Sequence, residues 1–212
     1  MENPSRRRLL AAGVAGTALS VVGGRVGSAK TTPPTSEPPT SPPPTSPPPT
    51  TPPQRPTEAD TEILTALQGL ELAARDLYQA ALDAGASDEA GVLATLRSNH
   101  EGYANGISGL IGGAAPQTPD EALFEEFVGD FETSDLEAVA AAGYDFESSV
   151  VATYLEALGE IEGIDGAALA ASILIVASRQ CAVLADLGGQ GDDLDALLVN
   201  DATPLSLGGD TT

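Results

Sequence analysis

Apolar residues recur at alternating steps of four and three through most of the chain after residue 57, which is the spacing of one face of an α-helix. No stretch alternates with period two, so no β-sheet is expected. The pattern predicts four long helices and two short ones, over residues 57–84, 87–111, 122–128, 134–161, 165–187 and 194–199. The predicted fold class is all-α, an antiparallel four-helix bundle with a short extra helix between helices 2 and 3 and a short C-terminal helix.

Particular residues mark where these helices begin, bend and end. Gly85 is expected to stop the first long helix, and the pair at residues 188–189 to stop the fourth. Ser134 and Glu137 have the spacing of a capping box at the start of the third. Gly143 lies inside that third helix and predicts a bend or a division there.

The first thirty residues differ from the rest of the chain. Arg6, Arg7 and Arg8 precede a modestly apolar run over residues 9–24 and a small-residue exit at 26–29. This order is typical of an export signal, and the paired arginines resemble a twin-arginine signal. Residues 1–29 are therefore predicted to be a signal peptide and the protein to be exported, extracytoplasmic, and secreted or associated with the cell envelope. A general secretory signal and an uncleaved anchor are the alternatives, whereas a stable membrane span after cleavage is not expected, because the run is weakly apolar.

A proline-rich segment follows the predicted signal. Thirteen of the 17 prolines lie between residues 33 and 56, among threonines and serines and without apolar residues that could pack. Residues 30–56 are predicted to form a disordered, extended, polyproline-like stalk. This composition is also found in O-glycosylated stalks.

The acidic residues are concentrated in the predicted helical domain, residues 57–212. That part has 29 acidic residues and three arginines, a formal charge of −26, so nucleic acid is excluded as a partner. A surface adapted to high salt, as in halophilic organisms, is the favoured interpretation, and a cation-binding surface is the alternative. Cys181, the single cysteine, excludes an intramolecular disulfide and is expected to be a buried small hydrophobe.

Polar residues on the apolar helix faces are the functional clue. His100, Tyr103, Glu147 and Gln180 lie on those faces, and Glu71 lies beside one. Because a bundle buries these faces, each such residue needs a hydrogen-bonding partner or a ligand. Tyrosines 78 and 154 are interpreted as ordinary core aromatics.

At these positions the sequence resembles the ferritin-like superfamily, in particular its exported ferritin-like domain proteins of unknown function. The resemblance covers about residues 57–205, and the string VASRQCAVL over residues 176–184 is similar to the family's VEARHAAVL. The resemblance implies that helices one and three each give a carboxylate, and that helices two and four each give a Glu-x-x-His pair, which together hold two iron ions.

Several of those ligand positions are degenerate here. Ala177 and Gln180 stand where helix four should have its Glu and His, and His100 and Tyr103 stand at the Glu and His positions of helix two. A register shifted by three would put Arg97 and His100 in the helix-two slots, but it takes Arg97 off the apolar face. Only Glu71 and Glu147, the carboxylates of helices one and three, keep the family's residue type.

Three residual ligands, Glu71, His100 and Glu147, are too few for two iron ions. The favoured expectation is therefore no cofactor and no catalytic residue, with a hydrogen-bonded layer in which His100, Tyr103 and Gln180 satisfy the two carboxylates. The alternative is a single Fe, Mn or Zn ion held by the three residual ligands. A variant of the hydrogen-bonded layer is that an arginine, Arg97 or Arg179, reaches the carboxylate pair and replaces the lost metal charge.

The function favoured by these expectations is that of an exported, non-catalytic ferritin-like domain protein acting in the cell envelope through an unidentified partner. The alternative is a mononuclear metal-binding or redox protein that protects against stress; as an enzyme it would be an iron-dependent oxidoreductase. A stress or desiccation role is a third class that rests on fold analogy alone. A homodimer is left open.

Overall fold

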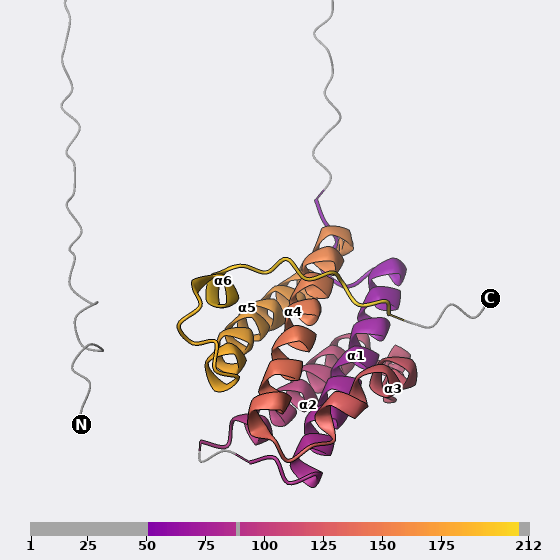
Figure 1. Cartoon of the computed structure of the whole chain (residues 1–212). Helices are drawn as coiled ribbons and strands as arrows, with labels where there is room; N and C mark the ends of the chain where they lie inside the picture. The colour runs from indigo at the N-terminus through magenta and orange to yellow at the C-terminus, as the bar shows by residue number, and fades with distance from the viewer. Residues whose placement is uncertain (1–50, 88–89, 208–212) are drawn as a thin grey trace, which may run out of the picture. The chain divides into compact units, whose positions relative to one another are not determined.

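Helices make up nearly all the regular structure of this chain in the computed structural model, which describes residues 51–87 and 90–207 (Figure 1). No strand occurs in these described residues, so the predicted all-α class is confirmed. The predicted signal peptide, and the stalk as far as residue 50, lie outside them. The elements are α1 (Glu58–Asp83), α2 (Val92–Ile111), a 3₁₀ turn η2 (Gly112–Ala114), α3 (Glu121–Phe131), α4 (Leu136–Glu160), α5 (Ile164–Leu187) and α6 (Leu194–Leu198).

The bundle consists of two tightly packed helix pairs, α1 with α2 and α4 with α5. The short helix α3 packs against α1 and α4 (Figure 1). α2 and α5 approach each other over a shorter stretch than the helices within either pair. The core between the pairs is almost entirely aliphatic and aromatic, so the buried polar residues described below form a distinct layer inside it.

The start of α1 is fixed to the turn between α4 and α5. The Thr57 hydroxyl accepts from the Asp60 backbone N–H, and the Asp60 carboxylate accepts from the Thr57 N–H at 2.8 Å, which completes a capping box. The same carboxylate accepts from the backbone N–H groups of Glu162 at 2.8 Å and Gly163 at 2.9 Å. Burial by itself raises the pKa of Asp60, but these three backbone donors outweigh it, and the pKa is lowered.

The segment just before α1 also binds the bundle. The carbonyl oxygens of Pro53 and Gln54 accept from the backbone N–H groups of Ile164 and Asp165, each at 3.0 Å. These N–H groups belong to the first turn of α5 and have no partner within their own helix. The last residues of the predicted stalk therefore cap α5.

Two predicted helix starts are wrong in detail. The second long helix begins at Val92, after Gly91 at φ +66°, rather than near Ser87. The cap of α4 is Asp135, whose carboxylate accepts from the Glu137 and Ala138 N–H groups, so the expected Ser134 capping box does not form.

Gly143 does not divide α4, which continues through it from Leu136 to Glu160. A Cβ at this position would lie 3.2 Å from the Leu184 side chain and 3.2 Å from the Tyr78 hydroxyl. The glycine is needed because two neighbouring side chains pack directly onto the helix backbone, so the sequence prediction of a division is wrong.

The C-terminal segment lies against α4. The Tyr144 hydroxyl donates to the Ala196 carbonyl in α6 at 3.0 Å. Further along, the Leu205 N–H donates to the Thr153 hydroxyl at 2.9 Å, and Leu205 and Leu207 pack against the core. The segment closes one side of the α4–α5 pair.

α5 is the most apolar of the long helices. Among the described residues it is the one helix long and apolar enough, by length and composition, to cross a membrane, with a mean hydropathy of 1.8 over its most apolar window. Only 33% of that window is buried in the bundle, although α5 packs along α4. Ile175 and Val183 are 63% and 46% exposed, so apolar side chains of α5 face outward.

Candidate functional site

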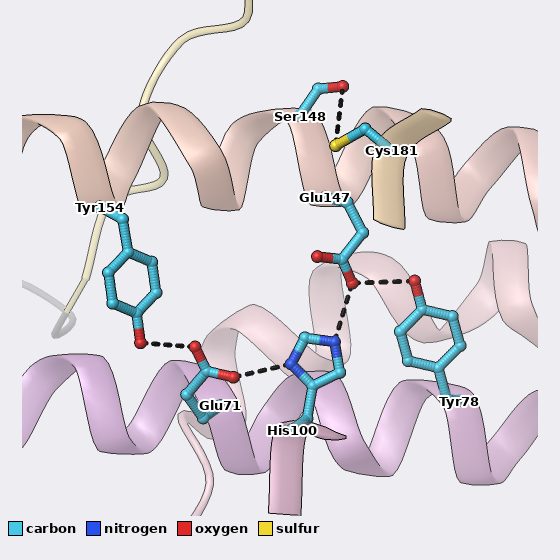
Figure 2. Close-up of polar contacts among 7 residues, drawn as sticks. All are labelled: Glu71, Tyr78, His100, Glu147, Ser148, Tyr154 and Cys181. Atoms are coloured by element: carbon cyan, nitrogen blue, oxygen red, sulfur yellow. Dashed lines mark hydrogen bonds and ion pairs between the residues drawn. The ribbon is translucent and has the colours of Figure 1, made fainter. Parts of the chain in front are cut away.

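A row of five hydrogen-bonded side chains crosses the centre of the bundle (Figure 2). His100 of α2 lies in the middle, with its Nδ1 2.7 Å from Glu71 Oε2 and its Nε2 2.8 Å from Glu147 Oε1. At the two ends, the Tyr154 hydroxyl donates to Glu71 Oε1 at 2.6 Å and the Tyr78 hydroxyl donates to Glu147 Oε1 at 2.9 Å. All five side chains are at most 1% exposed. We call these residues the central polar row.

The row is built from one sequence spacing used twice. Tyr78 follows Glu71 by seven residues on α1, and Tyr154 follows Glu147 by seven residues on α4. Seven residues are about two helical turns, so each pair shares one helix face. Because α1 and α4 run in opposite directions, each tyrosine reaches the glutamate of the other helix (Figure 2).

His100 is the cation of the row. Burial by itself lowers its pKa, but the neighbouring carboxylates of Glu147 and Glu71 outweigh this effect and raise the pKa from 6.5 to about 10. At neutral pH both ring nitrogens therefore carry protons and donate to the two carboxylates. The imidazolium provides the positive charge that two buried carboxylates require.

The tyrosines of the row stay neutral donors. Burial, followed by the charge of Glu147 for Tyr78 and of Glu71 for Tyr154, raises both tyrosine pKa values well above 10. The Tyr78 ring also stacks on His100, with ring centroids 5.5 Å apart and an interplanar angle of 13°. An aromatic face beside an imidazolium adds an attractive cation–π contact.

Sequence reasoning assigned two of these five residues no role. Tyr78 and Tyr154 are buried in the core as expected, but their hydroxyls satisfy the carboxylates, which was not expected. The signal that could have identified them is the repeated Glu-x₆-Tyr spacing on the first and third long helices.

Tyr103 and Gln180 do not satisfy the carboxylates, contrary to the prediction. The Gln180 amide instead acts as a hydrogen-bonding group on the Tyr103 hydroxyl and lowers its pKa. Within the described part of the chain, Glu147 Oε2 is buried and has no hydrogen-bonding partner. Burial, then Glu71 and Glu147, raise the pKa of Tyr103 to about 12, and its ring contacts that of His100 edge to face. Ala177, the other degenerate position, is buried as a small core residue.

The two arginines considered as a replacement for the metal charge are engaged elsewhere or exposed. Arg97 donates to Gln79 at 2.8 Å and pairs with Glu101 at 3.2 Å, and Arg179 is exposed on α5. The positive charge is supplied by His100 instead. Cys181 is buried as predicted; burial and then Glu147 raise its pKa to about 12, which leaves the thiol unreactive.

The donor set does not fit two iron ions. Of the family's six ligand positions only Glu71 and Glu147 keep their residue type, and His100 uses both nitrogens as donors to them. An imidazolium has no lone pair with which to bind a metal. Among residues 51–87 and 90–207, no group of three or more His, Cys, Asp and Glu side chains is arranged to hold a metal ion.

Comparison with known proteins gives one match. Residues 59–190, which contain the whole central polar row, match the family described as ferritin-like domain. No curated protein and no solved structure matches the chain.

Proposed function

Because this chain belongs to the ferritin-like domain family, we propose that it is a metal-independent member in which the proton on His100 takes the structural place of the metal ions. The bundle is then a rigid helical scaffold that acts through a partner in the cell envelope rather than by oxidation chemistry. It requires no cofactor to fold and has no catalytic residue.

This proposal rests on one observation: both ring nitrogens of His100 form hydrogen bonds to the two retained carboxylates. In a metal site of this family the carboxylates would face cations. Here the cation is the imidazolium itself, donating at 2.7 and 2.8 Å from a position that is 1% exposed. A metal ion entering the layer would have to displace a bound proton and break both charge-assisted hydrogen bonds.

The proposal also states that the protein is exported and located in the cell envelope. Support comes from the arginine-led apolar segment at residues 6–24 and the proline-rich segment before α1. The acid excess supports a salt-rich environment outside the cytoplasm. A proteolytic mass map of the protein from its native host would test this part, and a cytoplasmic chain with an intact residue 1 would contradict it.

Metal analysis tests the statement that the protein functions without a bound metal ion. The full chain, purified without chelator at high salt and offered iron(II), manganese(II) and zinc(II), is expected to carry no stoichiometric metal by mass spectrometry. A His100→Glu variant is the matched contrast, because it removes the buried cation and restores the family's carboxylate at this position. That variant should be stabilised by added divalent metal, whereas the natural chain should not.

A single metal ion is the second candidate, and one observation favours it. Among the described residues, Glu147 Oε2 is buried without a hydrogen-bonding partner, and a carboxylate oxygen is a ligand that divalent ions accept. Near-stoichiometric metal in the natural chain that disappears in a Glu71→Ala/Glu147→Ala variant would establish this candidate and overturn the metal-independent proposal.

A further inference from the structure

α5 has a regular pattern of residues on its outer side as well as on its buried side. The residues that it buries in the bundle are Gly166, Ala170, Ile173, Ala177, Gln180, Cys181, Leu184 and Ala185. A second set recurs at alternating steps of three and four on another side of the helix, and it consists of Asp165, Ala168, Ser172, Ile175 and Arg179. Asp165 is half-buried and the other four are exposed. We call this set the outer seam, because it has the spacing with which one helix packs along another.

The middle of the outer seam has the shape and apolar surface that a second helix could cover. Ile175 is its largest apolar side chain and is 63% exposed. Its neighbours on the seam, Ala168 and Ser172, are small, so another helix can come close to the α5 backbone there. Contact at this point would remove the isoleucine side chain from water, which favours association.

The charges of the outer seam are complementary to the same seam read in the opposite direction. Asp165 precedes Ser172 by seven residues and Arg179 follows Ser172 by seven, and seven residues are about two helical turns. If two α5 helices cross at Ser172 in antiparallel directions, each Asp165 faces the Arg179 of the partner subunit. The ion pair therefore forms twice, and this self-complementarity identifies the partner as a second copy of the chain.

The carboxylate of Asp165 can accept such a partner. One of its oxygens accepts from the Gln54 side-chain amide, and the other lies 3.9 Å from Nε of Arg55. The Arg55 side chain is 80% exposed, so this second pair is long and solvated and holds the oxygen only weakly. A guanidinium from another subunit can bond this oxygen more closely.

The rest of α5 allows two very acidic chains to meet. The domain from residue 57 onward has a formal charge of −26, so two copies repel each other wherever their acids come together. Between Asp165 and Asp186, α5 has no acidic residue, and Arg179 is its only charge in that interval. The outer seam is therefore a place where a second copy can make contact without opposing carboxylates of α5.

We propose that two copies of the chain form a twofold dimer through the outer seam. In this dimer the α5 helices are antiparallel and cross at Ser172, Ile175 packs on Ala168 and Ser172 of the partner subunit, and the pair between Asp165 and Arg179 forms twice. This inference goes beyond the proposed function and does not depend on the charge state of His100. It makes the unit that meets an envelope partner a symmetric dimer.

Sedimentation velocity of the full chain tests this proposal. High salt is the appropriate condition, because it screens the repulsion between two acidic copies and screens partly buried pairs much less. The natural chain is expected to sediment as a dimer that dissociates on dilution, and an Ile175→Glu variant, with an acid in the middle of the seam, as a monomer. Leu155→Glu is the matched control, because Leu155 of α4 is 64% exposed and lies outside the seam, and this variant should dimerise like the natural chain.

A mixing experiment tests the antiparallel arrangement. Asp165→Arg leaves two arginines on each seam and Arg179→Asp leaves two aspartates, so each variant alone should dimerise at least about tenfold more weakly than the natural chain. An equimolar mixture of the two should regain association, because every arginine then faces an aspartate of the other chain. Unchanged helical circular dichroism shows that each variant keeps its fold.

Three results would overturn the proposal. They are a natural chain that stays monomeric, a dimer that Ile175→Glu does not dissociate, and a mixture of the two charge variants that does not associate. If a monomeric natural chain instead floats with phosphatidylcholine vesicles, the apolar side of α5 belongs to a lipid surface and the dimer proposal fails.

Discussion

His100 is the residue on which the centre of this protein depends. It stands between two fully buried carboxylates and donates one hydrogen bond to each. A buried carboxylate without a cation is strongly unfavourable, so the three charges are stable only together. Because the chain has a single histidine, this one side chain provides the positive charge that compensates both carboxylates.

Removing that cation should be costly. A His100→Gln variant keeps an amide of similar size but leaves Glu71 and Glu147 buried without a positive charge. The free energy of unfolding is expected to fall by about 3–5 kcal/mol, the usual cost of breaking a buried ion pair by removing one partner. Denaturant unfolding followed by circular dichroism measures this, and a loss below about 1 kcal/mol would contradict the assignment of His100 as the cation, since that is the range of an exposed pair.

The tyrosines offer a matched comparison. Tyr78→Phe and Tyr154→Phe each remove a hydroxyl that donates to a buried carboxylate, and each should cost about 1.5–3 kcal/mol. Tyr103→Phe removes a hydroxyl that bonds no carboxylate and interacts with the neutral Gln180 amide, so it should cost less, at most about 1 kcal/mol. Equal losses in all three variants, measured by the same unfolding assay, would show that the row's hydrogen bonds are not what these tyrosines contribute.

The sequence could locate the carboxylates and the histidine but not their partners. Glu71, His100 and Glu147 were identified because polar residues on or beside an apolar helix face must be satisfied inside a bundle. Which neighbours satisfy them depends on how α1 and α4 are offset along their axes, and no local pattern contains that offset. Gln180 lies on the expected face for the same reason, yet it lines a groove rather than joining the row.

At the scale of the helices, apolar periodicity identified every long element within a few residues. The errors occur where a residue far along the chain decides the local geometry. Asp60 bonds the backbone of Glu162 and Gly163, more than a hundred positions away, so its burial could not be read from its own helix. Gly143 was expected to bend or divide α4, but the helix continues through it and the glycine makes room for Leu184 and Tyr78.

The close approach at Gly143 can be tested against a second helical glycine. Gly143→Ala places a methyl group 3.2 Å from the Leu184 side chain and the Tyr78 hydroxyl, and overpacking of this kind costs about 1–3 kcal/mol. Gly102 lies inside α2 with nothing within 4 Å of its Cβ position, so Gly102→Ala should stabilise by about 0.5–1 kcal/mol. Thermal melts of the two variants should move in opposite directions, and a stabilising Gly143→Ala would refute the packing argument.

For the whole molecule, the raised pKa of His100 makes stability depend on pH. Between the ordinary histidine pKa of 6.5 and about 10, the folded protein holds a proton that the unfolded chain has released. The stabilisation is complete below pH 6.5 and is lost as the pH rises through about 10, with a slope of at most about 1.4 kcal/mol per pH unit. Unfolding measured from pH 6.5 to about 7.5, below the ordinary thiol pKa of about 8.5, should show this decline in the natural chain.

The His100→Gln variant is the control for that decline and should be nearly flat over the same interval. A natural chain whose stability rises, or does not change, between these pH values would mean that the folded state holds no extra proton there.

The most direct test of the central claim is nuclear magnetic resonance of the full chain with ¹⁵N-labelled histidine, in which the single histidine gives one set of ring signals. If the proton of His100 replaces the metal, both ring nitrogens will remain protonated through neutral pH, titrate only near pH 10, and stay unchanged when zinc(II) or iron(II) is added. A ring that titrates near pH 6.5, or that loses an N–H signal on addition of one equivalent of metal, would contradict the claim and identify His100 as a metal ligand.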